Sequence, residues 1–249
     1  MSEILEHGDA FFFYRPRVGV AEVAGLSDVQ RFVVILKPDD HPRYRRLIVG
    51  RKRLPDPRSH EREWAFVVEV TDDPAELRAD IEEEPRAQPA GAARYAIVDH
   101  GGHTHLAYAR PQSPDSAAVQ RELNIRQQAS YIIAVRNPDA PAPPGAGLPE
   151  HRRAQYPPEL RERFGGRRFI PADPPELLDY PGAEVVLIGA AEDASRALGL
   201  ELDRHAEPLE HTGRLRRCSR TRAGRRPRRL RRFVPAAIRP GVPAASLGG

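Results

Sequence analysis

The clearest structural signal in this chain is the run Phe32-Val33-Val34-Ile35-Leu36-Lys37, which a Pro-Asp pair follows. Continuous apolar runs that are rich in β-branched residues are typical of strands covered on both faces. Three more segments have the same character, and they lie at 66–70, 132–135 and 185–188. These four segments predict the central strands of a sheet.

The run at 32–37 has a counterpart in Tyr131-Ile132-Ile133-Ala134-Val135-Arg136, and other short matches occur in the same order along the chain. They pair 4–8 with 97–101, 14–16 with 108–111, 29–31 with 119–121, 45–48 with 167–170, and 65–70 with 184–189. The shared order favours an internal duplication. The alternative is chance resemblance in a chain that uses few residue types. The His-Gly pairs at 7–8 and 100–101 are interpreted as the same turn in each copy.

Helix signals follow several of the strands. Asp73, Pro74 and Glu76 form a start signal with a capping box, and the segments 113–123 and 192–199 also predict helices. The predicted fold class is therefore α+β (mixed α/β), with two similar strand-rich halves. The first repeat spans 1–84, a Pro/Ala/Gly-rich linker 85–93 and the second repeat 94–204. The halves form either two packed subdomains or one continuous mixed sheet.

The charge of the chain is divided at one point. Up to Thr212 there are 27 basic and 35 acidic residues, a formal charge of −8, whereas the segment 213–249 holds 12 arginines and no acidic residue. We expect 205–249 to be a disordered, Arg-rich C-terminal tail. A cationic arm of this kind binds nucleic acid or acidic membrane. The alternative is a frameshifted segment, because shifted GC-rich codons yield Arg, Pro, Gly and Ala without an apolar period.

Composition also indicates where the protein works. The one cysteine, Cys218, lies in the Arg-rich segment, so residues 1–212 form no disulfide and contain no cysteine nucleophile. The first nine residues lack the basic and apolar regions of a secretory signal, and no apolar run approaches the roughly 20 residues that cross a bilayer. We expect a cytoplasmic protein without a transmembrane segment.

The densest cluster of candidate ligands is His100-Gly101-Gly102-His103-Thr104-His105. His103 and His105 share one face of a strand, and His100 is a candidate third ligand of a metal ion. No carboxylate follows at a matching spacing, and the first copy has no equivalent histidine. The interpretation that we favour is a β-hairpin without metal, in which the two glycines form the turn.

A second candidate is the basic segment 43–53, with Arg43, Arg45, Arg46, Arg51, Lys52 and Arg53. It is a possible site for phosphate or nucleic acid, with Tyr44 available to stack on a base. The interpretation that we favour is an edge strand whose arginines pair with acidic residues of the same chain. In the aromatic run 11–14, Phe11 and Phe13 are either packed in the core or part of a protein interface.

Several catalytic patterns are missing. The chain has no Walker-type phosphate loop, no dinucleotide-binding glycine pattern after a strand and no nucleophile elbow, and no acid/base pair stands out. We therefore assign no catalytic residues and no cofactor.

Three segments resemble a group of uncharacterised bacterial proteins. They are the opening 7–18, the segment 51–57 and the segment 167–178, and the resemblance covers roughly 3–203. It implies that this part is a recurrent fold with the tail outside it, and it implies no activity, cofactor or site.

Taken together, these observations predict a non-enzymatic binding or interaction protein that takes a protein partner, a second copy of itself or a small ligand. The alternatives are a metal-dependent enzyme that uses His100, His103 and His105, and a protein that binds nucleic acid through its tail.

Overall fold

The computed structural model describes residues 2–20, 22–111, 117–142 and 147–202. Nine strands dominate it: β1 (Glu3–Pro16), β2 (Val29–Pro38), β3 (Tyr44–Val49), β4 (Arg62–Thr71), β5 (Gln88–His100), β6 (His103–Ala109), β7 (Gln128–Arg136), β8 (Phe169–Pro171) and β9 (Glu184–Ala191). The helices are short: α1 (Pro74–Ile81), α2 (Ala117–Glu122), α3 (Pro158–Glu162) and α4 (Ala194–Leu198), with 3-10 turns η1 (Leu26–Asp28), η3 (Glu150–Arg152) and η4 (Pro175–Leu178).

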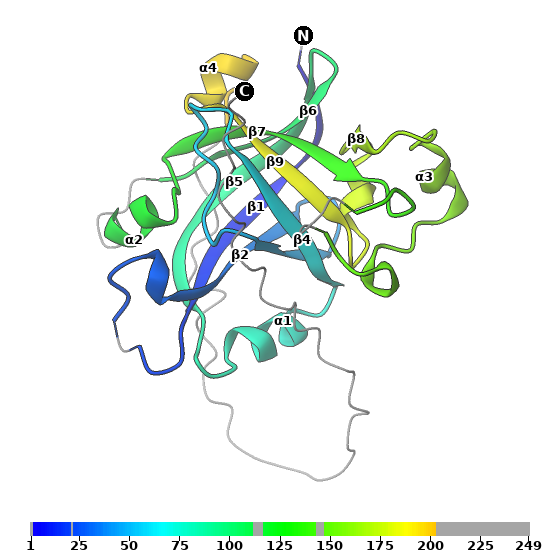
Figure 1. Ribbon diagram of the computed structural model, residues 1–249. Coiled ribbons are helices and arrows are strands. Elements are labelled where there is room, and N and C mark those ends of the chain that lie inside the picture. The colour runs from blue at the N-terminus through cyan, green and yellow to red at the C-terminus, as the bar shows by residue number, and fades with distance from the viewer. Residues whose placement is uncertain (1, 21, 112–116, 143–146, 203–249) are drawn as a thin grey trace, which may run out of the picture.

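Eight of the strands close into an antiparallel barrel (Figure 1). The order is β6-β5-β1-β2-β3-β4-β9-β7, and β6 pairs with β7 to complete the ring. β8 adds a short pairing at the end of β7, where Ile170 lies opposite Val135. Closure pairs both edges of the sheet, so these eight strands have no free edge along which another chain could add.

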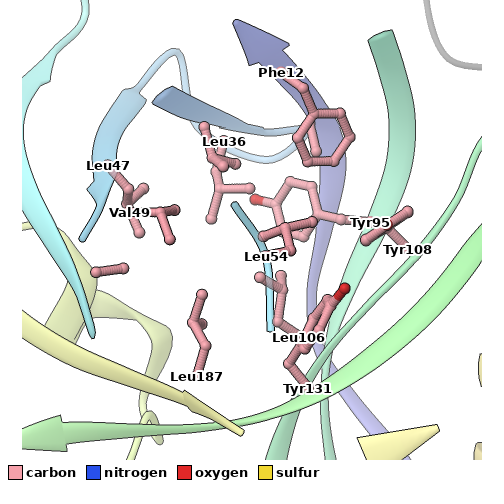
Figure 2. Close-up of a pocket in the computed structure, with 13 residues that line it drawn as sticks. Phe12, Leu36, Leu47, Val49, Leu54, Tyr95, Leu106, Tyr108, Tyr131 and Leu187 are labelled. Carbon is pink, nitrogen blue, oxygen red and sulfur yellow. The ribbon is translucent and has the colours of Figure 1, made fainter. Parts of the chain in front are cut away.

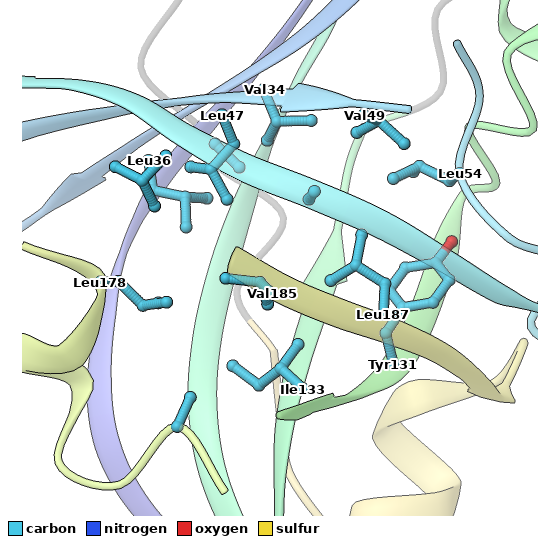
Figure 3. Packing of buried hydrophobic residues seen from close by; sticks show 14 of the residues in the cluster. Val34, Leu36, Leu47, Val49, Leu54, Tyr131, Ile133, Leu178, Val185 and Leu187 are labelled. Carbon is cyan, nitrogen blue, oxygen red and sulfur yellow. The ribbon is translucent and has the colours of Figure 1, made fainter. Parts of the chain in front are cut away.

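Strand periodicity places one face of each strand inside the barrel. Alternate residues of β1 to β3, among them Phe12, Val34 and Leu47, point inward and join the main hydrophobic cluster. Figure 3 shows part of this cluster, in which Leu178 from η4 packs with the strand side chains. The inward faces of the strands therefore form the core.

The outer face of β1 and β2 is also covered. Phe11, Phe13, Val33 and Ile35 form a second buried cluster with Leu77 of α1, which lies outside the barrel (Figure 1). This cover explains why positions 32–36 are all apolar, because one set of side chains faces the barrel core and the other faces α1.

The predicted fold class, α+β, is wrong. The molecule is a closed antiparallel β-barrel with few, short helices. The four apolar runs do lie in strands, but only β2 is buried on both faces, because outward side chains of β7 and β9 such as Ile132 and Val186 are half-buried. The helix signals after the strands correspond only to short helices, and the strands pair antiparallel around one barrel.

Both predicted halves contribute four strands to one barrel. β1 to β4 form the first meander, and β5, β6, β7 and β9 form the second. Two of the sequence matches pair long apolar runs. The match of 65–70 with 184–189 relates β4 to β9, and each of these is the fourth strand of its meander. The run at 32–37 is the second strand of its meander, whereas the run at 131–136 is the third.

Two local predictions differ from the structure. Residues 88–93, expected in a linker, begin β5 and pair with β1. The His7-Gly8 pair, expected at a turn, lies within β1. Gly8 is needed there because a Cβ atom would overlap the carbonyl of Lys37 on β2. A close backbone approach, rather than a turn, accounts for this glycine.

The predicted helix boundaries are confirmed at two places. Asp73 caps α1, accepting a hydrogen bond from the Ala75 N–H at 2.8 Å, although Glu76 bonds to Thr71 rather than completing a capping box. Gly199 ends α4 in the left-handed conformation with φ 65°. In the part of the chain that the structure describes, no helix has the length and apolar character needed to span a bilayer.

Candidate functional site

An apolar cavity of about 20 Å³ lies inside the barrel. Figure 2 shows that aromatic rings line one side and that aliphatic side chains, such as those of Leu47, Val49 and Leu187, line the other. The lining residues come from β1 to β7, from β9 and from the loop after β3: Ala10, Phe12, Val34, Leu36, Leu47, Val49, Leu54, Ala65, Tyr95, Leu106, Tyr108, Tyr131 and Leu187. Small side chains at Ala10 and Ala65 leave space that larger residues would fill.

Two buried tyrosines form part of the aromatic side, and only their apolar atoms face the cavity. The rings of Tyr108 and Tyr131 are 6.3 Å apart between centroids, and both are buried. The Tyr108 hydroxyl accepts a hydrogen bond from the Arg126 backbone N–H at 3.0 Å. The Tyr131 hydroxyl is buried and interacts with the Tyr108 hydroxyl, although this contact falls outside normal hydrogen-bond geometry. Burial raises the pKa of Tyr108 to about 12 and that of Tyr131 well above its usual value, so both remain neutral.

A buried charge network begins at one end of the cavity. The Tyr95 hydroxyl donates to Glu6 at 2.7 Å, and Glu6 accepts two hydrogen bonds from the Arg45 guanidinium at 2.6 and 2.8 Å. Arg45 Nε also donates to Asp179 at 2.6 Å. Asp179 follows η4, which packs over this end of the barrel. The network therefore ties the η4 segment to the strands.

The protonation states follow from this geometry. Burial alone would lower the pKa of Arg45, but the hydrogen bonds and charges of Glu6 and Asp179 outweigh burial and raise it. Burial, and then the neighbouring Glu6 carboxylate, raise the pKa of Tyr95. Arg45 is thus held as a cation and Tyr95 as a neutral donor. A buried charge of this kind is tolerated because its hydrogen-bonding groups are paired.

Outside this end of the barrel, Arg43 pairs with the second carboxylate oxygen of Asp179 while remaining 47% exposed. Beside it is an open depression of about 270 Å³. His41, Pro42, Arg43, Val70, Thr71 and Asp72 line it. A line of ion pairs therefore runs from the surface at Arg43, through Asp179, to Arg45 inside the barrel.

The predicted histidine cluster lies on the β5–β6 hairpin, where His100 pairs with His103 and Gly101 and Gly102 have φ 61° and 81°. His100 Nδ1 is 2.8 Å from the Ser2 hydroxyl and His105 Nδ1 is 3.0 Å from the Ser130 hydroxyl, while His103 is exposed. Among the described residues, no three His, Cys, Asp or Glu side chains are arranged to hold a metal ion. The geometry gives the predicted metal site no support.

The basic segment does not present a free cationic surface. Arg43 and Arg45 contact Asp179, and Arg46 contacts Glu69 at 2.9 Å and also Asp80. Arg51 and Arg53 both contact Glu61, and Lys52 donates to the Val29 carbonyl at 2.6 Å. Each of the six predicted phosphate-binding residues therefore has a partner within this chain.

Phe11 and Phe13 are buried against α1, with exposures of 4% and 5%. Their contacts are therefore within the chain in this structure, and the predicted interface role stays a prediction. The tail at 205–249 lies outside the described residues, so the predictions made for it also stand as predictions.

Sequence reasoning missed the residues around the cavity, namely Glu6, Tyr95, Tyr131 and Asp179. One signal was present in β3, where Arg45 shares a strand face with Leu47 and Val49, so a charge lies in line with core residues. Nothing local connects that arginine with Asp179, which is 134 residues away.

The candidate site is assigned from the structure of this chain. The chain was compared with protein-family models, with curated proteins and with solved structures, and none of the three comparisons finds a match.

Proposed function

We propose that this chain is a binding protein that holds a small, largely apolar molecule inside its barrel. The observation that carries the proposal is the apolar cavity enclosed by eight strands. Ligand sites are commonly concave and apolar with a few placed polar groups, and an eight-stranded barrel has room for one small ligand. At about 20 Å³, little more than the space of a water molecule, the cavity limits the occupant to about one or two heavy atoms.

The environment of the cavity supports binding rather than catalysis. The polar groups nearest to it are neutral tyrosines, and the side chains of Glu6, Arg45 and Asp179 are paired with one another. No side chain in the lining is a nucleophile or an acid/base group with a pKa near neutrality. We place this activity in the cytoplasm, in keeping with the single cysteine of the chain.

Xenon is a suitable probe, because dry apolar cavities bind it without any specific polar contact. We expect saturable xenon binding to the full chain, followed by xenon chemical shift and by shifts of cavity methyl resonances such as those of Leu187. Ala65→Val, which adds two methyl groups to the lining, is expected to weaken binding about tenfold or more, because it fills the space.

Ala75→Leu is the matched control, since Ala75 lies on the exposed side of α1 and the change adds similar bulk away from the cavity. It is expected to bind xenon like the unmodified protein. If xenon shows no saturable binding, or if Ala65→Val and Ala75→Leu behave alike, the cavity is not a binding site.

A further inference from the structure

The outward side of β4, β9 and β7 carries an apolar surface. Trp64 on β4 lies opposite Val186 on β9, which lies opposite Ala134 on β7, and Ile188 lies opposite Ile132. The residues that alternate with them along each strand belong to the barrel core, so these five side chains point outward. Each of the five is half-buried. We call these five residues the outer face.

The fold leaves the outer face uncovered. In Figure 1, β4, β9 and β7 lie at the front of the barrel, and α1, α3 and α4 lie around them rather than across them. None of the five residues packs against a hydrophobic cluster of the described part of the chain. The outward side of β1 and β2 differs, because Leu77 of α1 covers it. An apolar surface that no described element covers indicates contact with another molecule.

Aromatic rings continue the outer face toward β8. The Trp64 ring is 6.3 Å from the Phe66 ring and 6.0 Å from the Phe169 ring between centroids. The Arg168 guanidinium lies 5.9 Å from the centroid of the Phe169 ring. Tryptophan and arginine are enriched among the residues that dominate the energetics of protein interfaces. This composition favours a protein partner.

Two cationic side chains border the outer face. Arg62 is exposed on β4 opposite Ile188, and Arg168 is exposed beside the aromatic rings. Neither guanidinium has a carboxylate partner among the described residues, whereas the arginines of the segment 43–53 are all paired. Complementary charge therefore requires acidic side chains on the partner. It also argues against the chain's own segment 213–249 as the occupant, because that segment holds 12 arginines and no acidic residue.

The dimensions of the outer face suit a helix. Three neighbouring strands about 4.8 Å apart form a surface about 10 Å wide, which matches the diameter of one α-helix with its side chains. A partner strand has no place to pair, because closure leaves the eight barrel strands without a free edge. A single amphipathic helix is the element that covers a surface of this width.

We propose that the outer face binds an amphipathic helix of a partner protein. The apolar stripe of that helix packs on Trp64, Val186 and Ile188, and acidic side chains beside the stripe pair with Arg62 and Arg168. This surface is outside the barrel, so the inference goes beyond the proposed function and does not depend on the cavity.

Trp64 is the only tryptophan of the chain, so its fluorescence reports contact at the outer face. The probe is a synthetic helical peptide of about five turns, without tryptophan, whose leucine stripe is flanked by glutamates. A matched peptide carries lysines in place of the glutamates. We expect the glutamate peptide to shift the Trp64 emission of the full chain saturably to shorter wavelength. The lysine peptide is expected to bind about tenfold more weakly, because its charges face two arginines.

Two substitutions separate the apolar contribution from the charged one. Ile188→Ser removes apolar contact area and is expected to weaken binding of the glutamate peptide by about tenfold. Arg62→Gln is expected to weaken it by about threefold, the effect of one lost exposed ion pair. The urea midpoint of each variant verifies that it is folded.

Ile4→Ser and Arg86→Gln are the matched controls. Ile4 is 51% exposed on β1, and Arg86 is exposed between α1 and β5. Both variants are expected to bind the glutamate peptide like the unmodified chain. Peptide that is held by the Arg-rich segment alone would respond to none of the four substitutions, and that result overturns the inference.

Equal affinity for the two peptides, or unchanged affinity in Ile188→Ser, also overturns the inference. Sedimentation of the unmodified chain tests the remaining occupant, a second copy. A dimer that Ile188→Ser converts to a monomer would show that the outer face joins two copies, and would overturn the proposed acidic helix. Xenon binding tests the cavity separately, so failure of one proposal leaves the other standing.

Discussion

Gly8 shows how one backbone contact constrains a strand. It lies in the middle of β1, opposite Pro38 and next to the Lys37 carbonyl of β2, with no room for a side chain. We expect Gly8→Ala to destabilise the protein by about 1–3 kcal/mol, because the added methyl group forces the two strands apart. Urea unfolding measures the change.

Gly25→Ala is the control for that substitution, since the nearest atom to its added Cβ is a Glu122 carboxylate oxygen at 3.9 Å. We expect its stability to stay within about 0.5 kcal/mol of the unmodified chain. Equal effects at the two glycines would show that the close approach in β1 is not a constraint.

His105 links stability to pH. Burial, and then the positive charges of His100 and His103, lower its pKa to about 4, against a smaller opposing effect of Asp99. Above pH 6.5 the imidazole is neutral in both the folded and the unfolded chain. Between about pH 6.5 and 4 the unfolded chain binds the proton and the folded chain does not, so stability falls as the pH falls.

We expect His105→Gln to remove this part of the pH dependence. Between pH 7 and pH 4, the melting temperature of the variant should therefore fall less than that of the unmodified chain. His151→Gln, at an exposed position of η3, is the control and should follow the unmodified chain. A constant difference for His105→Gln across this range would contradict the assigned pKa.

At the scale of elements, η4 and the following residue, Asp179, cover one end of the barrel, and ion pairs hold them there. Leu177 and Leu178 pack into the core, and Asp179 joins both Arg43 and Arg45. The pair with Arg45 is almost completely shielded from solvent, with side-chain exposures of 1% and 6%. Shielded pairs hold a segment more firmly than exposed ones. For the proposed binding function, we therefore expect release of the Asp179 ion pairs to open this end of the barrel.

Asp179→Asn should loosen that cover. We expect a loss of about 1–3 kcal/mol in stability and faster exchange of bound xenon, measured from its line width, because the arginines lose a charged partner. Asp139→Asn is the control, since it breaks an exposed pair with Arg161 and should cost less than about 1 kcal/mol. Unchanged xenon exchange in Asp179→Asn would show that ligands enter elsewhere.

The same scale explains which elements were predictable. The Asp73 cap, the Gly199 end of α4 and the Gly101-Gly102 turn all depend on residues within a few positions of one another. β5 was missed in its first half, because 88–93 is rich in Pro, Ala and Gly and has no strand periodicity. Its pairing with β1, where Ala93 lies opposite Ala10, places it in the sheet.

At the scale of the whole molecule, strands from both halves of the chain form one barrel around a single enclosed core. The pairing of β6 with β7 closes the ring, and the β4–β9 and β1–β5 pairings join the two meanders. Closure has two consequences for function. It removes exposed strand edges, and it creates an interior whose shape depends on residues from eight strands at once.

Local pattern was sufficient to identify the four central strands and the helix ends, because periodicity, capping and turn conformation depend on near neighbours in the chain. The closure of the barrel and the content of its interior were not accessible in the same way. Glu6 and Tyr95 are 89 residues apart, and Arg45 and Asp179 are 134 apart. No short-range pattern records such pairings, so the candidate site exists only once the strands have closed around it.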